Sequence, residues 1–389
     1  MHKLRILFLL LTASCLWACS SSKQDDPFEP DPKPEPQLVG ISFGGNNNTW
    51  QDAPTTRAGK TGLETLFPSF RVWGYKTTDA TLASSQLVMD GYHVQYTQGT
   101  SGSTTTNTAD WEYVGISNPS TTQTIKYWDY SASSYRFFAY APYDAQVTSA
   151  STATGTADEC TTFSYPFTYS ETTTAKSIPY VSELWFSKNA TTDSPYGQNV
   201  TLTFAPLIAK MRFKFIYPEG TTSIKIKDIQ FCDSRFIADP TIATTPLCGT
   251  LSVSYPHQGT PTSSTPLFSW ENATENAMGA LVFTTPYEEE SDQIHILDDP
   301  TQYGKWYYVP PFDIAKYEQG AYTINANIDG NHSSATIPSA YTQWKAGYQY
   351  TYIFKITQAG TVITFSDLQV EEWLPGADFN NNGNGTEGW

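Results

Sequence analysis

The chain has 389 residues, of which 15% are aromatic and only 15% are charged, and its formal net charge is −16. An acidic surface of this kind repels phosphate backbones, so the charge argues against nucleic acid as a partner. Thr, Ser and Tyr are abundant, and β-branched and aromatic side chains favour strands over helices because they pack well on pleated surfaces. The length allows two sizeable hydrophobic cores or one large one.

The N-terminus has the organisation of a bacterial lipoprotein signal peptide. Lys3 and Arg5 precede an apolar run that is too short to span a bilayer permanently. The run ends in the motif Leu-Trp-Ala-Cys, whose last residue, Cys19, is the expected site of lipidation. We therefore expect an exported protein that is anchored to a membrane by lipid. The same residues also allow an ordinary signal peptide that is cut near Ala13 or Ser14.

An acidic, proline-rich stretch follows the lipidation motif. The alternation Asp-Pro-Lys-Pro-Glu-Pro at residues 31–36 favours polyproline II geometry and predicts a semi-rigid spacer. After it comes a short apolar run, from Leu38 to Phe43. The run leads to a loop, Thr-Thr-Arg-Ala at residues 55–58, in which Arg57 is expected to be exposed.

The rest of the chain consists of short alternating or apolar runs separated by Thr, Ser, Gly, Asn and Pro. Such runs are typical of antiparallel strands with one solvated face. Helical periodicity is almost absent, apart from a turn or two expected at 62–67. The predicted strands include residues 70–75, 135–140, 202–204, 211–216, 224–229, 322–328 and 350–356.

Regular short strands over this length predict an all-β fold with two tandem antiparallel β-sandwich domains. A break in the pattern at Asp-Ser-Pro-Tyr-Gly, residues 193–197, places the expected boundary there. The predicted organisation is a signal peptide at 1–18, a disordered tether at 19–37, sandwich domains at 38–195 and 196–375, and a flexible tail at 376–389.

Apart from Cys15 and Cys19 of the export segment, the chain has three cysteines, Cys160, Cys232 and Cys248. An odd number argues against a disulfide framework. Cys232 and Cys248 could pair in an oxidising compartment, or both could be small buried side chains.

Six motifs follow one another along the chain: TTRA at 55–58, FRVWGY at 70–75, YRFFAYAP at 135–142, VTLTFAPLIAKMRFKF at 200–215, WKAGYQY at 344–350 and VEEW at 370–373. In this order they resemble the fimbrillin family of Bacteroidales, the FimA- and Mfa-like lipoprotein pilins and tip adhesins. Family members often carry His after the Phe of a Leu-x-Phe strand, whereas this chain has Ala205 and Pro206. Because Pro cannot donate in a strand ladder, we expect an edge or a bulge there.

The resemblance implies transthyretin-like domains and an assembly mechanism. A trypsin-like protease would cut between Arg57 and Ala58 and so release the first strand of the N-terminal domain, residues 38–57. Another subunit would then fill the vacated place by strand addition. The displaced strand would carry Leu38, Val39, Ile41 and Phe43, and the donor strand Ile363, Phe365, Leu368, Val370 and Trp373.

The same residues have a plainer interpretation, in which the last strand never leaves its own sheet and Arg57 is an ordinary loop residue. If the resemblance holds, the expected partners are other fimbrial subunits, either copies of this chain or accessory subunits, together with host or bacterial surface receptors. The expected location is a fimbrium on the cell surface, held to the outer membrane by the lipid anchor. The tail after Trp373 fits a tip or accessory subunit as well as a stalk subunit.

No catalytic motif, phosphate-binding loop or metal-ligand spacing is present, so we expect neither an enzyme nor a cofactor. An acidic stretch at 288–299 could bind calcium, but a solvated loop is the preferred interpretation. The alternative function is glycan binding, as a surface lipoprotein of an outer-membrane carbohydrate-uptake system. Aromatic rings stack on sugars, although each candidate is more often a core residue: Trp111, Trp128, Trp270 and Trp306.

Overall fold

The computed structural model describes residues 38–44, 63–78, 85–98, 103–104, 110–119, 122–145, 147–151, 160–170, 172–188, 196–216, 226–233, 247–255, 266–272, 281–282, 306–311, 322–328, 330–357 and 362–372. The chain divides into Met1–Leu38 and Val39–Trp389, and all described residues except Leu38 belong to the second unit. Its regular structure there is all-β, with two short 3-10 turns, η2 (Leu63–Thr65) and η7 (Ser339–Tyr341). No helix among the described residues is long and apolar enough to cross a membrane.

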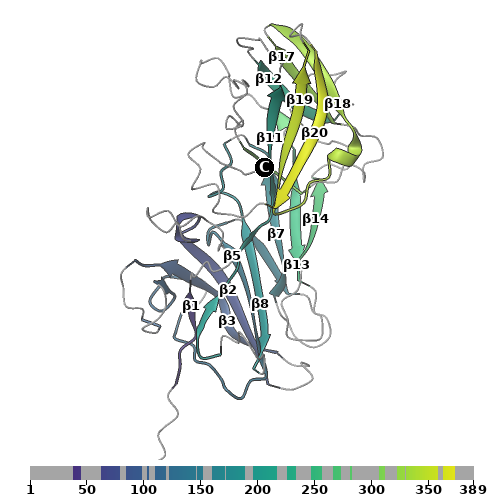
Figure 1. The fold of residues 1–389 in the computed structure, drawn as a ribbon. Helices are drawn as coiled ribbons and strands as arrows, with labels where there is room; N and C mark the ends of the chain where they lie inside the picture. Colours follow the sequence, from purple (N-terminus) through teal and green to yellow (C-terminus); the bar gives the residue numbers. More distant parts are fainter. Residues whose placement is uncertain are drawn as a thin grey trace, which may run out of the picture. The chain divides into compact units, whose positions relative to one another are not determined.

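The largest sheet has eight strands in the order β10-β8-β5-β2-β3-β4-β1-β9, and Figure 1 labels most of them. One internal strand, β5, is buried at every position, as expected for a strand covered on both faces. The strands are β1 (Ser42–Gly44), β2 (Ser69–Thr77), β3 (Ser85–Tyr96), β4 (Trp111–Glu112), β5 (Ser134–Ala141), β8 (Tyr180–Ser187), β9 (Asn199–Thr201) and β10 (Ala205–Pro206).

This sheet curls strongly. Three strands separate β1 from β5 in the sheet order, which in a flat sheet would place them roughly 19 Å apart. Yet the ring centroids of Phe43 on β1 and Phe137 on β5 lie 5.9 Å apart. The curl therefore brings β1 over β5 of the same sheet, and the two strands share one core.

A second sheet, in the order β14-β13-β7-β6, covers the opposite face of β5 and completes the first sandwich. Phe163 of β7 contacts Trp73 and Tyr140, with ring centroids 5.9 Å and 5.7 Å apart. Just after β13, Tyr255 packs on Phe138 at 5.8 Å. The strands of this sheet are β6 (Thr148–Ser151), β7 (Cys160–Thr168), β13 (Cys248–Ser254) and β14 (Leu267–Asn272).

Strand pairing crosses the domain boundary that the sequence suggests near residue 195. β13 pairs with β7 along its whole length, and β9 and β10 belong to the eight-stranded sheet. A sequence boundary drawn at a turn cannot anticipate this arrangement, because long-range pairing leaves no local signal. The division at 195 and 196 stays a prediction, and strand pairing joins residues on both sides of it.

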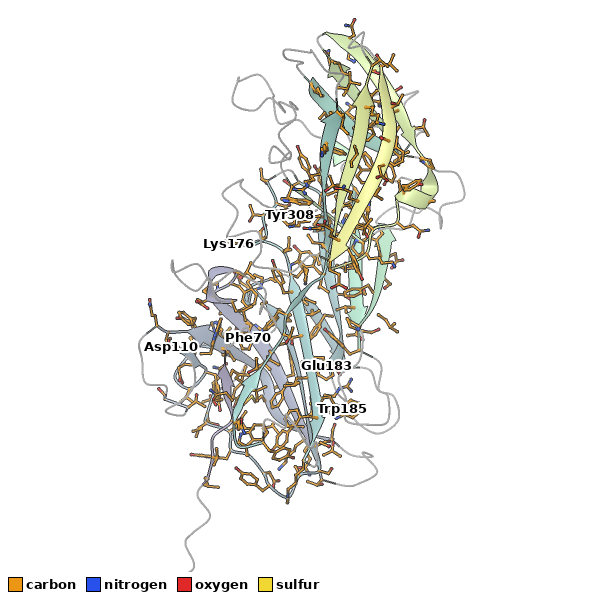
Figure 2. All side chains as sticks on the ribbon, in the orientation of Figure 1. Phe70, Asp110, Lys176, Glu183, Trp185 and Tyr308 are labelled. Atoms are coloured by element: carbon orange, nitrogen blue, oxygen red, sulfur yellow. The ribbon has the colours of Figure 1, made fainter. Side chains whose placement is uncertain are left out.

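A buried ion pair joins two neighbouring strands of the eight-stranded sheet. Arg136 of β5 meets Glu183 of β8 at 2.5 Å, with both side chains at most 2% exposed. The guanidinium lies 4.5 Å from the ring centroids of both Phe138 and Trp185, and Nη2 donates to the carbonyl oxygen of Tyr255 at 3.4 Å. Glu183 and Trp185 are labelled on β8 in Figure 2.

The second sandwich packs the sheet β16-β11-β19-β20 on the sheet β15-β12-β17-β18. Phe231 of β12 contacts Phe213 of β11 and Tyr352 of β19, with ring centroids 5.8 Å and 5.4 Å apart. The strands are β11 (Ala209–Ile216), β12 (Ile226–Asp233), β15 (Leu281–Val282), β16 (Tyr307–Val309), β17 (Tyr322–Ile328), β18 (Asn331–Ile337), β19 (Tyr348–Ile356) and β20 (Ile363–Glu372).

The predicted all-β sandwich fold is confirmed, although two pairings, β1 with β9 and β11 with β19, are parallel. One predicted strand is wrong: residues 202–204 form the link between β9 and β10, with Leu202 and Phe204 buried, so their alternation reflects core contacts and not ladder pairing. The edge predicted at Pro206 is confirmed, because β10 is the last strand of its sheet and pairs only with β8.

Candidate functional site

The segment Val39–Gly44 is held by backbone hydrogen bonds to the segments on either side of it. The amide of Ile41 donates to the carbonyl oxygen of Lys126 at 2.7 Å, and the amide of Trp128 donates to that of Val39 at 2.9 Å. β1 then pairs with β9 in parallel. On its other side, Phe43 pairs with Trp111 of β4, and this pairing is antiparallel. We call the residues that contact Val39–Gly44 the β1 site.

The side chains of the segment fill the core below it. Ile41 is fully buried and Phe43 is 1% exposed, whereas Leu38, at 68% exposed, lies outside the core. Phe43 makes edge contacts with three rings, whose centroids are 5.8 to 6.2 Å away: Phe70, Tyr113 and Phe137. Phe70 is labelled in Figure 2. Burial of two large apolar side chains stabilises this segment by several kcal/mol, at about 1.5 to 3 for each.

Polar contacts fix the position of the segment along its neighbours. The buried hydroxyl of Tyr113 donates to the carbonyl oxygen of Ile41 at 2.8 Å and accepts from the amide of Lys126 at 3.1 Å. Burial raises the pKa of Tyr113 well above its usual range, so the hydroxyl stays protonated. Ser42, which is 2% exposed, donates its hydroxyl hydrogen to the side-chain oxygen of Asn199.

This arrangement leaves β1 short and internal. It contributes few residues to the sheet, yet it has a strand on each side, β4 and β9. Removing Val39–Gly44 would therefore open two unpaired edges, an apolar cavity and an unsatisfied hydroxyl on Tyr113. A second extended segment could satisfy the same groups by strand addition.

At the other end of the described chain, β20 is an edge strand that pairs only with β19; the two are the yellow strands in Figure 1. A β-bulge at Ser366 separates two paired stretches, since Phe365 lies opposite Phe354 and Asp367 lies opposite Ile353. The bulge explains the irregular spacing of the apolar residues in β20. It brings all four onto one face, opposite inward-facing residues of β19: Ile363, Phe365, Leu368 and Val370.

Burial decreases along β20. Ile363 is 2% exposed, Phe365 and Leu368 are half-buried, and Val370 is 49% exposed. Phe365 contacts the rings of Tyr341, Tyr352 and Phe354, at centroid distances of 5.1 to 6.5 Å. The beginning of the strand is therefore a core element and its end is a surface element.

Several predicted site residues lie outside the described part of the chain: Cys19, Arg57, Ala58 and Trp373, as well as most of the displaced strand beyond Gly44 and the acidic stretch at 288–299. Cys248 carries a free thiol on β13, and Cys232 lies on β12 of another sheet. Within the described residues, no group of three or more His, Cys, Asp or Glu side chains could hold a metal ion.

The structure places the tryptophans considered for sugar stacking in two environments. Trp111 and Trp128 are core residues, at 1% and 3% exposed, so they cannot stack on a glycan. Trp270 and Trp306 are half-buried. The ring of Trp306 faces the charged groups of Lys210 and Arg212, at 4.3 Å and 4.2 Å from its centroid.

Sequence reasoning placed Leu38 to Phe43 in one strand but missed the groups that hold it. Tyr113, Asn199 and the backbone at 126–128 come from segments with no strand periodicity of their own. The sequence around Tyr113 indicates its role only weakly, because buried tyrosines in short loops are common and the local sequence does not show which backbone group each one binds. The sequence predicts Leu38 as one of the displaced apolar side chains, but Leu38 is 68% exposed and is not part of the core.

Comparisons with known proteins add a family to this geometry. Residues 56–373 match the family model described as fimbrillin-like. Among solved structures, a candidate cell adhesion protein from Bacteroides uniformis is 12% identical, with a TM-score of 0.43, over 88% of this chain and 100% of its own. A fimbrial protein from Bacteroides vulgatus is 14% identical, with a TM-score of 0.43, over 87% and 100%. No curated protein matches the chain. At such identities the structural similarities concern the fold alone.

Proposed function

This chain belongs to the fimbrillin-like family, and from that premise we propose that it is a non-catalytic fimbrial subunit or tip adhesin of the cell surface. In this proposal a protease cuts after Arg57, the segment before the cut leaves the β1 site, and a strand of another subunit takes its place. The resulting fibre presents the protein for adhesion to host or bacterial surfaces.

The observation that carries the proposal is the position of β1. An ordinary N-terminal strand that caps a sheet has one neighbour, and its loss leaves one edge. β1 instead lies between β4 and β9, with Ile41 and Phe43 in the core. A vacancy of this kind offers an incoming strand backbone partners on both sides and apolar pockets below it.

The proposed donor is β20. Its edge position means that leaving the sheet breaks one ladder and not two. Its apolar residues on one face, Ile363, Phe365, Leu368 and Val370, together with the following Trp373, are the side chains that would enter the pockets of the acceptor.

Export and anchoring complete the proposal. Lipidation at Cys19 would tether the newly exported subunit to the outer membrane, and residues 19–37 would hold the folded part away from it. A cut after Arg57 separates the folded part from the lipid, so the same event would release the subunit and open its β1 site.

The proposal is tested on the chain that begins at Ser20, treated with a limiting amount of an Arg-specific protease. Mass spectrometry locates the cut and size-exclusion chromatography follows assembly. The expected result is a cut after Arg57 followed by higher oligomers. Arg57→Lys is the matched control, because it keeps the charge but resists the protease. A clean cut that leaves an unchanged monomer would contradict the proposal.

A further inference from the structure

Two tripeptides in this chain share one pattern of side chains. Ile41-Ser42-Phe43 lies in the β1 site, and Ile363-Thr364-Phe365 begins β20. Each has a β-branched apolar residue, a small hydroxyl residue and a phenylalanine, in the same order. In both, the outer two side chains lie on one face of a strand and the hydroxyl residue lies on the other.

The surroundings of the two phenylalanines are also alike. Phe43 makes edge contacts with three aromatic rings in the first sandwich, and Phe365 contacts three aromatic rings in the second. Ile41 and Ile363 are both fully or almost fully buried. A strand that moves from the second environment to the first would therefore again place its isoleucine in a core and its phenylalanine among aromatic rings.

The middle position adds a polar match. Ser42 is buried and its hydroxyl bonds to the side-chain oxygen of Asn199. Thr364 carries the same hydroxyl and is exposed on β20, where it donates to the carbonyl oxygen of Lys355 at 3.3 Å. In the place of Ser42 it could donate to Asn199.

The register that uses the second half of β20 fits the site poorly. If Leu368 and Val370 took the two apolar pockets, Gln369 would occupy the place of Ser42, where only 2% of the residue is exposed. Asp367 would then lie at the buried position of Gly40. An uncompensated carboxylate in such a position is costly. The match ends at the tripeptide, because Val362 and Ser366 differ from the glycines at 40 and 44.

We propose that the occupant of the vacated β1 site is a second copy of this chain, whose Ile363, Thr364 and Phe365 take the places of Ile41, Ser42 and Phe43. The incoming strand runs in the same direction as β1 and so lies parallel to β9. This inference rests on the proposed strand exchange and specifies its partner and its register. It makes the chain self-complementary, since each copy carries both the site and the strand that fills it.

The test uses a peptide, so that the fold of the acceptor is not disturbed. The acceptor is the chain from Ser20, labelled on its terminal amine with a fluorophore and cut after Arg57. Loss of fluorescence anisotropy reports release of the N-terminal fragment. A synthetic peptide of residues 361–372 should release it. Phe365→Ala in the peptide should weaken the effect roughly tenfold or more, because a large buried side chain is lost. Glu371→Ala, at an exposed position outside the tripeptide, should change it less than about threefold.

Disulfide trapping then reads the register directly. The acceptor carries Asn199→Cys and the peptide carries Thr364→Cys, which the proposed register places side by side as Ser42 and Asn199 are now. Mass spectrometry of the digested product identifies the joined cysteines, so the native cysteines can remain. Peptides with Val362→Cys or Ser366→Cys are the controls, and both should trap poorly. An acceptor with Ser42→Cys and Asn199→Cys, left uncut, shows that the position can form the bond.

The outcomes separate the inference from the function it rests on. Fragment release with equal trapping at 362 or 366, or without any effect of Phe365→Ala, would overturn the register while leaving strand exchange in place. If the peptide neither inhibits the oligomers of the cut chain nor becomes part of them, β20 of a second copy is not the donor strand. A cut chain that neither releases its fragment nor assembles would reject the proposed function, and the register with it.

Discussion

The hydroxyl of Tyr113 bonds to the carbonyl oxygen of Ile41 across 2.8 Å and closes the β1 site over the segment that the proposed cut would free. The hydroxyl oxygen of Tyr113 also accepts the amide hydrogen of Lys126, at 3.1 Å. One buried hydroxyl thus links the segment to two neighbours, and its partner on the segment is a backbone group that any incoming strand would also provide.

Replacing Tyr113 by Phe should loosen the segment without emptying the core. The ring stays, but two buried backbone groups lose their partner, which should lower the free energy of unfolding by about 1 to 3 kcal/mol. Urea denaturation measures the loss. Tyr127→Phe is the control, because Tyr127 is 42% exposed, and it should change the stability by less than about 0.5 kcal/mol. Equal effects of the two changes would contradict the role given to the Tyr113 hydroxyl.

Truncation of Phe43 should have a larger effect. Phe43→Ala removes a ring that is 1% exposed and contacts three other rings, so we expect a loss of about 3 to 5 kcal/mol in the free energy of unfolding. After the cut at Arg57 it should also speed the release of the N-terminal fragment. Leu38→Ala, at a position 68% exposed, should be nearly neutral in both measurements. A destabilising Leu38→Ala would show that the site begins earlier in the chain.

The buried pair of Arg136 and Glu183 should be sensitive to loss of one partner. Glu183→Gln leaves the guanidinium without a counter-charge between two aromatic rings, and we expect a loss of about 3 to 5 kcal/mol in the free energy of unfolding. The double change Arg136→Met with Glu183→Leu removes both charges and should recover much of that loss. Thermal unfolding of the single and double variants measures it. If the double variant is as unstable as the sum of the single ones, the pair does not act as a unit.

His93 should make stability fall in mildly acidic solution. Its Nδ1 bonds to the carbonyl oxygen of Ser117 at 2.9 Å, its Nε2 is buried without a hydrogen-bond partner, and Tyr143 stacks on the ring at 3.7 Å. Burial lowers the pKa of His93 below its ordinary value of 6.5, with Arg71 acting in the same direction and both the Ser117 bond and Asp144 opposing it.

The sign of the effect follows from this lowered pKa. The unfolded chain binds the proton more readily than the folded one, so stability is complete above about pH 6.5 and falls as the pH drops from there toward the folded pKa. Unfolding midpoints in urea between pH 7.5 and 5 should show the decrease. His93→Gln should flatten the profile over this range, and an unchanged profile in that variant would assign the dependence to other groups.

The sequence predicted the strands whose apolar residues alternate without interruption, such as those around Phe137, Phe213 and Tyr352. It could not predict partners, because pairing between β13 and β7 or between β1 and β9 depends on residues far apart in the chain. The spacing from Phe365 to Leu368 departs from strict alternation, and the bulge at Ser366 accounts for it. The charged residues Arg136 and Glu183 gave no sign of a buried pair, since each sits in an ordinary strand pattern.

The central claim is that the segment before Arg57 leaves the β1 site when subunits join. The most direct measurement is the composition of the oligomers that form after the cut. Size-exclusion chromatography isolates the oligomers, and mass spectrometry under denaturing conditions identifies the chains that they contain. The expected oligomers lack the fragment from Ser20 to Arg57. Oligomers that retain one fragment for each chain would show that β1 stays in place and that subunits join by another surface.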